Sequence, residues 1–439
     1  MITRREFLDT AAVAAAGLAV TSSAKSYARI IGANDRVNFA IIGLNSRAYA
    51  HLSSLKANQK DAQITHVCDV DTPILEKFAG KTETAMGTKP LAEKDFRKVL
   101  ASSDVDAITI ATPDHWHAPM AIAGLEAGKH VYVEKPCSHN PAEGAMLVAA
   151  RDKYKKLVQM GSQQRSSPHT IEVAQKVKEG LIGRAYYAKA WYSNTRKSIG
   201  EGKVIPVPAT LDWDLWQGPA PRRPYKNNYH PYNWHWFWHW GTGETLNNGT
   251  HEIDVCRWIL DVGYPKHIAA SGGRYHFKDD WQFYDTLITD FNYDDKMISW
   301  EGKCCQGMKF YNRDRGSAIM GTTGTVVVDR GGYEIYDLKG TKTSEFKAEK
   351  SSASADLVGA DSMTDRHFAN LIAGIRTGEK LNAPIEVGNV AVTMLQLSNV
   401  AWKLGRGLTT DQTNGKVLND PEAMKYWDRE YEKGWAPKV

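Results

Sequence analysis

The chain contains few cysteines, and their spacing excludes two common ways of holding a fold together. Its 439 residues include five cysteines, at Cys68, Cys137, Cys256, Cys304 and Cys305. This odd number and these spacings form neither the paired ligands of a zinc site nor a disulfide framework. We therefore expect free, buried thiols and no bound metal.

The chain also lacks a strong excess of charge of either sign. Its 55 basic and 50 acidic residues give a formal net charge of +5 at pH 7, and both kinds are dispersed along the sequence. This balance is too small for a nucleic-acid surface, so we exclude nucleic acid as a partner. The hydrophobic content of 42% and charged content of 24% are those of an ordinary soluble globular protein, long enough for two domains.

No apolar run is long enough to cross a bilayer comfortably, so we expect no stable membrane span. The apolar residues 11–20 follow Arg4-Arg5 and precede a plausible cleavage site at residues 26–28. This order resembles a twin-arginine export signal, which predicts a periplasmic protein with residues 1–33 as signal and linker. The alternative is an amphipathic N-terminal helix that belongs to the fold.

Residues 37–50 predict a strand, a tight turn and a helix, the arrangement that binds a dinucleotide. The apolar strand breaks at Gly43, and a helix that opens directly after a strand aims free N–H groups and a positive dipole end at a pyrophosphate. Asn45 stands where a second glycine is usual, and its side chain restricts how closely a phosphate approaches, although asparagine tolerates left-handed angles. Ser46 and Arg47 complete the turn.

A second predicted strand, residues 63–68, ends at Asp69. Asp69 follows Gly43 at about the spacing at which an acidic side chain meets the adenosine ribose. A carboxylate there repels a 2′-phosphate, so the sequence favours NAD over NADP, although Arg47 could counter that preference. The alternative for Asp69 is a solvated loop carboxylate.

Residues 34–161 alternate short apolar strands with amphipathic helices, which predicts a doubly wound parallel sheet. Ligands of such sheets bind at the carboxyl ends of the strands. The residues that follow two later strands are therefore expected to face the cofactor. They are Thr112, Pro113, His117, Glu134 and Lys135. A surface lysine in a loop is the alternative for Lys135.

Together with a later histidine, His251, these motifs resemble the Gfo/Idh/MocA family, named after glucose-fructose oxidoreductase and inositol dehydrogenase. The resemblance covers nearly all of the chain after the export signal. It implies an α/β protein: an N-terminal Rossmann dinucleotide-binding domain (34–161), then an α+β domain (162–439) with an open, mostly antiparallel sheet. It also implies C-terminal helices that pack back between the domains. The open sheet face suggests a homo-oligomer.

The resemblance implies that His251 transfers the proton, oriented by an aspartate four positions earlier. This chain has Asn247 there, and an amide positions an imidazole without stabilising its positive charge. Asp254, on the same helical face as His251, and Glu244 are alternatives for the orienting carboxylate.

Oxidation of an alcohol needs a base that titrates near the working pH and a positive charge near the developing alkoxide. His251 and Lys135 supply these two groups. A metal site built from His115, His117 and His251 is the alternative, but no nearby acidic pair accompanies these histidines.

The tract of residues 229–240 is rich in alternating tryptophans. In an extended segment they would share one face, and Trp236 and Trp238 are candidates for a platform under a sugar ring. A core or a subunit interface is the alternative. Arg165 and Asp254 are further candidates for binding the substrate.

We expect an NAD(P)-dependent oxidoreductase that acts on a ring hydroxyl of a sugar or glycoside and recycles a tightly bound cofactor in place. The periplasm supplies no expected pool of free NAD, which is why recycling is required. One alternative is net glycoside cleavage through transient oxidation, elimination, hydration and re-reduction. Another is a non-catalytic nucleotide- or carbohydrate-binding protein.

Overall fold

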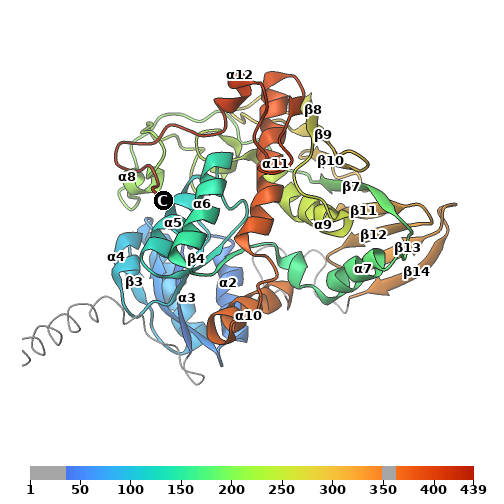
Figure 1. The fold of residues 1–439 in the computed structure, drawn as a ribbon. Helices are drawn as coiled ribbons and strands as arrows, with labels where there is room; N and C mark the ends of the chain where they lie inside the picture. Colours follow the sequence, from blue (N-terminus) through green and yellow to red (C-terminus); the bar gives the residue numbers. More distant parts are fainter. Residues whose placement is uncertain (1–35, 349–361) are drawn as a thin grey trace, which may run out of the picture.

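The computed structural model describes residues 36–348 and 362–439. The predicted export signal, its cleavage site and the linker up to residue 33 lie outside the described residues. Figure 1 shows the arrangement of the described chain: one sheet with its helices forms the N-terminal part, and a larger, strongly twisted sheet forms the second part.

The first sheet is parallel, with its strands in the order β3-β2-β1-β4-β5-β6. Its strands are β1 (Val37–Ile42), β2 (Ala62–Cys68), β3 (Leu91–Glu93), β4 (Ala107–Ile110), β5 (His130–Val133) and β6 (Val158–Met160). Strands β1, β4 and β6 are buried along their whole length, because helices cover both faces of the sheet. The strand order reverses between β1 and β4, which opens a ligand crevice at that point.

Five helices of the described chain surround this sheet, and two of them begin at a residue whose side chain caps the first turn. The five helices are α2 (Ala48–Ala57), α3 (Thr72–Met86), α4 (Phe96–Ala101), α5 (Asp114–Glu126) and α6 (Pro141–Tyr154). The side chains of Asp95 and Asn140 accept hydrogen bonds from the first turns of α4 and α6. These two caps help to fix the residues at which α4 and α6 begin.

The second sheet is mostly antiparallel, as predicted, and its order is β14-β13-β12-β11-β7-β10-β9-β8-β15. Only β7 and β10 pair in parallel among its described strand pairs. Its strands are β7 (Ala185–Ser193), β8 (His267–Gly273), β9 (Thr286–Asn292), β10 (Met297–Lys303), β11 (Arg315–Gly321), β12 (Thr325–Asp329), β13 (Gly332–Tyr336), β14 (Lys342–Lys347) and β15 (Leu408–Thr409). The predicted fold class is confirmed.

Helices cover one face of this second sheet, and the other face is open (Figure 1). The helices of this part are α7 (Pro168–Lys178), α8 (Trp213–Gln217), α9 (Thr250–Leu260), α10 (Ser362–Thr377), α11 (Ile385–Leu404) and α12 (Pro421–Met424). On the open face Ile288 is 49% exposed. The homo-oligomer expected from this face stays a prediction.

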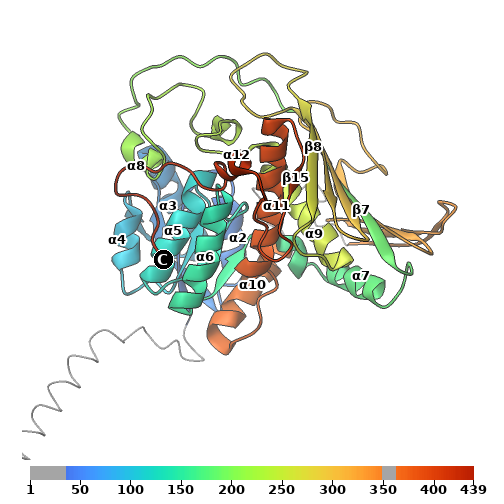
Figure 2. The same ribbon diagram turned by 45° about the horizontal axis from the view of Figure 1, so that its top comes forward.

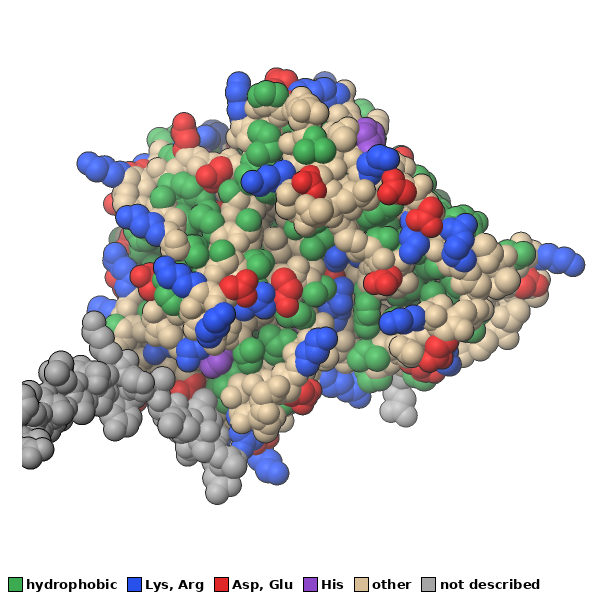
Figure 3. Space-filling model, viewed as in Figure 1, with side chains coloured by type: hydrophobic (Ala, Val, Ile, Leu, Met, Phe, Trp, Pro, Cys, Tyr) green, Lys and Arg blue, Asp and Glu red, His purple; other side chains and the backbone are tan. Residues whose placement is uncertain are grey.

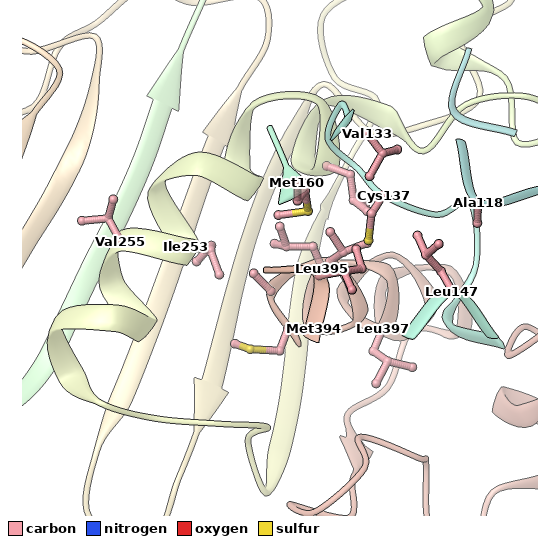
Figure 4. Close-up of a cluster of buried hydrophobic side chains, with 14 of the residues drawn as sticks. Ala118, Val133, Cys137, Leu147, Met160, Ile253, Val255, Met394, Leu395 and Leu397 are labelled. Atoms are coloured by element: carbon pink, nitrogen blue, oxygen red, sulfur yellow. The ribbon is translucent and has the colours of Figure 1, made fainter. Parts of the chain in front are cut away.

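Helix α11 lies between the two sheets and joins their cores into one. Its buried side chains Met394, Leu395 and Leu397 belong to one hydrophobic cluster with Cys137 and Leu147 of the Rossmann part and with residues of α9 (Figure 4). The prediction that C-terminal helices pack back between the domains agrees with this position. The two domains are therefore held together by continuous apolar packing.

A long excursion between β7 and α9 crosses over the Rossmann part, and we call residues 203–240 the cover segment. Figure 2 shows it, with α8, above the strand ends of the first sheet. It is hydrogen-bonded to the loop after β2: Asp212 N donates to Val70 O at 3.1 Å, and Thr72 N donates to Thr210 O at 3.1 Å. The second domain thus closes over the first at the rim of the crevice.

On the face shown in Figure 3, basic and acidic side chains are interspersed. Among the helices of the described residues, none is both long and apolar enough to span a bilayer.

Candidate active site

A cavity that is open to solvent lies at the strand ends where the order of the first sheet reverses, and the space between its walls and at its mouth is about 1230 Å³. It is lined by every residue predicted to hold the cofactor, and by Asn247 from the second domain. These residues are Gly43, Asn45, Ser46, Arg47, Asp69, Thr112, Pro113, His117, Glu134, Lys135 and Asn247. The cover segment supplies the opposite wall with Trp216, Trp234 and His235.

The turn after β1 has the shape that a pyrophosphate requires. Gly43 has a φ of +82°, and a Cβ on it would lie 2.7 Å from Thr112 N, so only glycine fits. Ser46, with a φ of +44°, and not Asn45, takes the left-handed conformation. Among the described residues, the backbone N–H groups of Asn45 and Ser46 have no acceptor, so they suit a phosphate at the N-terminus of α2.

Asp69 lies at the end of β2 and is tied to the same turn. Its Oδ2 accepts a hydrogen bond from Leu44 N at 2.8 Å, and its Oδ1 accepts one from Asp71 N at 3.0 Å. Burial raises the pKa of Asp69 to about 6, although these hydrogen bonds act in the opposite direction. The carboxylate is therefore positioned to accept from a ribose hydroxyl, and its charge depends on pH near neutrality.

Arg47 is engaged with a buried carboxylate that also lines the cavity. Its Nε donates to Glu134 Oε1 at 2.7 Å, and His51 Nε2 lies 3.0 Å from the same oxygen. Burial alone would raise the pKa of Glu134, but Arg47, His51 and Lys135 outweigh it and hold that pKa well below its ordinary value. Because this ion pair occupies Arg47, the guanidinium is not directed at a 2′-phosphate, which favours NAD.

Lys135 is held by the second domain. Its Nζ donates to the backbone oxygen of Asn247 at 2.6 Å and to Asn247 Oδ1 at 3.2 Å. Asn247 is presented by a π-helical turn, Thr245–Gly249, directly before α9. Burial lowers the pKa of Lys135, while the charges of Glu134 and Asp114 oppose that shift. A cation thus lies at the end of β5 with neutral oxygen partners.

The structure does not place His251 in the cavity, which differs from its predicted role. The residue is 2% exposed, and neither ring nitrogen has a hydrogen-bond partner among the described residues. Burial, with the positive charges of Arg330, Arg315 and Lys135, holds its pKa well below the ordinary value.

The alternative orienting carboxylates have other partners. Asp254 accepts two hydrogen bonds from Arg165, at 2.6 Å and 2.9 Å, in the interior. Glu244 pairs with Arg196 and with the Asn248 amide. The prediction of Arg165 and Asp254 as substrate ligands does not match these positions, because they bind each other and line no part of the cavity.

The alternating tryptophans do not all lie on one extended segment, because Asn233–Trp236 forms a 3-10 helix. Trp236 stacks on Trp281 with ring centroids 4.0 Å apart, and Trp238 stacks on Phe283 at 4.2 Å. Both rings therefore belong to the packing of the second domain, whereas Trp234 reaches the cavity. In a 3-10 helix, side chains two residues apart point in different directions, so these tryptophans do not share a face.

Asp114 and His235 also line the cavity. Asp114 is buried at the start of α5 and accepts a hydrogen bond from Thr242 Oγ1 at 2.5 Å. The position of Asp114 directly after Pro113 was a usable signal, since α5 begins there. Within the described ranges, no group of His, Cys, Asp and Glu residues could hold a metal ion.

The fold and the site define a two-domain dinucleotide-binding protein with an open-sheet second domain. Residues 37–162 match the Gfo/Idh/MocA domain described as "Oxidoreductase family, NAD-binding Rossmann fold". Residues 155–298 match the domain described as "Oxidoreductase family, C-terminal alpha/beta domain". The chain belongs to the Gfo/Idh/MocA oxidoreductase family, and its first domain is the NAD-binding Rossmann domain of that family.

Curated relatives match over part of the chain. A glycosyl hydrolase family 109 protein of Shewanella pealeana is 28% identical over 210 residues, 44% of this chain and 46% of that protein. An alpha-N-acetylgalactosaminidase of Shewanella oneidensis is 26% identical over 211 residues, with the same shares. The matched part of the chain thus spans less than half the length of these relatives.

Among solved structures, the WlbA dehydrogenase of Bordetella pertussis, in complex with NADH and UDP-GlcNAcA, is similar in fold. It superposes with a TM-score of 0.64 at 19% identity, over 86% of this chain and 99% of that one.

Replacing Arg165 with alanine should destabilise the protein without a direct effect on the cavity. The change leaves the buried Asp254 carboxylate with only the more distant Arg257, 3.7 Å away, and removing one partner of a buried pair costs about 3–5 kcal/mol. Arg97→Ala is the matched control, since it breaks the exposed pair with Asp95 and should cost about 1 kcal/mol or less. Equal thermal melting temperatures for the two variants would contradict the assignment.

NAD affinity should fall as the pH drops below about 6. The raised pKa means that Asp69 takes up a proton there, and the neutral acid accepts hydrogen bonds from ribose hydroxyls less well than the carboxylate does. Calorimetric titration of nucleotide-free protein between pH 5 and 8 measures this step. The Asp69→Asn variant should bind NAD more weakly at pH 8, and its NAD affinity should not fall further below pH 6. If the affinity of this variant still falls below pH 6, a group other than Asp69 is responsible.

Proposed function

We propose that this protein is an NAD-dependent enzyme that oxidises a ring hydroxyl of a sugar or glycoside and keeps its cofactor between half-reactions. The observation that carries the proposal is Lys135, a cation with neutral partners, at the strand ends of an NAD-binding domain. The sugar is favoured by the relatives, since a glycosidase and a dehydrogenase crystallised with a nucleotide sugar are similar to this chain.

Different residues of the cavity would bind NAD and the substrate. The turn at Gly43 would hold the pyrophosphate and Asp69 the ribose, because their N–H groups and carboxylate match those parts of NAD. When bound, NAD supplies the hydride acceptor. Lys135 then donates a hydrogen bond to the substrate oxygen and stabilises the negative charge that develops as the C–H bond breaks.

Retention of the cofactor is supported by the cover segment. Its hydrogen bonds to the loop after β2 flank Asp69, and His230 Nε2 lies 3.6 Å from Asp71 Oδ2 beside them. These contacts would partly enclose a nucleotide bound beside them. Slow release suits an enzyme whose reduced cofactor is reoxidised in place.

Net glycoside hydrolysis is the second candidate, and the family 109 glycosyl hydrolase relatives favour it. A ketone at one ring carbon acidifies the neighbouring C–H, so that a proton is lost and the anomeric substituent leaves. Water then adds to the double bond and the ketone is reduced again. The sum is the glycoside plus water giving the free sugar and the alcohol, with no net use of NAD.

A panel of p-nitrophenyl glycosides separates the candidates. Hydrolysis predicts nitrophenolate release without a net change in absorbance at 340 nm, whereas net oxidation predicts NADH accumulation. Lys135→Met should lower kcat by roughly 10²- to 10³-fold, as loss of a charge-stabilising donor does. Lys60→Met, at an exposed site, is the control. Full activity of Lys135→Met would reject the site, and nucleotide binding without turnover of any sugar would favour the binding-protein alternative.

We also propose export to the periplasm through the twin-arginine pathway, on the basis of Arg4-Arg5 and the apolar residues after them. Export of a folded protein allows NAD to be bound in the cytoplasm first. Replacing both arginines with lysine should leave the protein in the cytoplasmic fraction with its nucleotide, whereas the unchanged chain should be found in the periplasmic fraction. The same location for both proteins would refute this proposal.

A further inference from the structure

We propose that the C-terminal tail, residues 425–439, fastens the cover segment to the Rossmann domain and thereby slows release of a bound nucleotide. The effect on release rests on the proposed function, whereas the fastening itself does not. The structure describes the whole tail, and it contains neither helix nor strand. Figures 1 and 2 show that the tail runs from α12 past α8 and ends beside α5. It therefore passes both parts that it would join.

An arginine of the tail binds a buried carboxylate of the Rossmann domain. Arg429 Nε donates to Glu143 Oε1 at 2.8 Å, and Arg429 Nη2 lies 2.6 Å from the same oxygen. The Glu143 side chain is fully buried, and the Tyr431 hydroxyl also donates to it, at 3.1 Å. Arg429 Nη2 donates further to His115 O at 2.7 Å. Because charge-assisted hydrogen bonds are stronger than neutral ones, this contact anchors the tail on the first turns of α5 and α6.

The residues that follow this anchor bind the cover segment. Glu432 N donates to Pro219 O at 3.0 Å, and Glu432 Oε2 accepts a hydrogen bond from Arg222 N at 3.2 Å. Pro219 lies just after α8, the helix that contains Trp216 of the cavity wall. One short stretch of the tail thus holds the Rossmann domain at Arg429 and the cover segment at Glu432.

The tail, the cover segment and α5 also meet at one tryptophan ring. Trp116 of α5 lines the cavity, and its Nε1 donates to Trp216 O at 2.9 Å. Gly218 of the cover segment lies so close that a Cβ on it would overlap the Trp116 ring. The Trp435 ring of the tail meets the Trp116 ring edge to face, with centroids 5.3 Å apart. Displacement of the tail would therefore loosen a side chain on which the cavity wall is packed.

The position of these contacts predicts an effect on rates. None of the described cavity-lining residues belongs to the tail, so the tail contributes no lining contact to a ligand in the cavity. Movement of the cover segment would open one wall of the cavity, and contacts that break during such a movement slow it. We therefore expect the tail to set how often the segment opens.

Hydrogen exchange tests the fastening without any nucleotide. In the full-length protein, Arg429→Ala should speed exchange of the amides of residues 212–222 by about 10-fold, as loss of hydrogen bonds to a charged group does. Strand β5 should stay protected. Arg406→Ala is the matched control, because it breaks an exposed ion pair with Asp420 that lies before the tail.

A second variant guards against misfolding of the first. Trp435→Ala removes the ring contact with Trp116 and leaves the buried Glu143 carboxylate with its arginine, so it should also speed exchange of residues 212–222. Unchanged exchange of this segment in both tail variants would overturn the inference.

Release kinetics test the consequence. NADH bound to each protein is displaced by excess NAD, and the loss of its fluorescence gives the dissociation rate constant. Both tail variants should release NADH about 10-fold faster than the wild type and Arg406→Ala. A general loss of stability would instead lower the fraction of protein that binds NADH and leave the rate constant of the folded fraction unchanged. That result would overturn the link between the tail and release.

The outcomes distinguish this inference from the proposed function. Wild-type protein that turns over a sugar, with tail variants that match it in exchange and in release, would overturn the role of the tail alone. Wild-type protein that binds no nucleotide would overturn the proposed function and the effect on release, and hydrogen exchange would still decide whether the tail fastens the cover segment.

Discussion

The hydrogen bond from the Lys135 ammonium to Asn247 is the contact on which the site depends. A buried cation requires oxygen partners, and here they come from the other domain, on the π-helical turn before α9. The lysine is therefore directed only when both domains are in place. Lys135 follows a strand of the Rossmann part, and its hydrogen bonds to Asn247 of the second domain fix the position of its ammonium group.

Two cations near the cavity floor have different roles because their partners differ. Arg47 is neutralised by the Glu134 carboxylate, whereas Lys135 is bound by neutral oxygens of Asn247 and keeps its charge available. A carboxylate at position 247, as the family resemblance implies, would form an ion pair with this lysine. Asparagine removes that competition, so the departure from the pattern strengthens the field that Lys135 exerts on a bound oxygen.

Most of the Rossmann domain could be predicted, because its buried strands and the turns after them are local signals, whereas the short, exposed strand β3 (Leu91–Glu93) has none. Gly43, Asp69 and Lys135 follow strands directly, so the topology alone brings them together. His251 and Trp236 could not be placed in this way. Their directions depend on a π-helical turn and on a 3-10 helix, which the periodicity of the sequence does not reveal. The pairing of Arg165 with Asp254 joins residues far apart in the chain and has no local signature.

The shared core around α11 has a consequence for how ligands enter. Proteins that bind ligands between two domains often open by rotation of one domain about a flexible hinge. Here the apolar packing of Leu395 and its neighbours runs unbroken across the junction, and bending there would expose it to water. We therefore expect entry of a ligand into the cavity to depend on movement of the cover segment (203–240), which forms one of its walls, and not on a hinge between the domains.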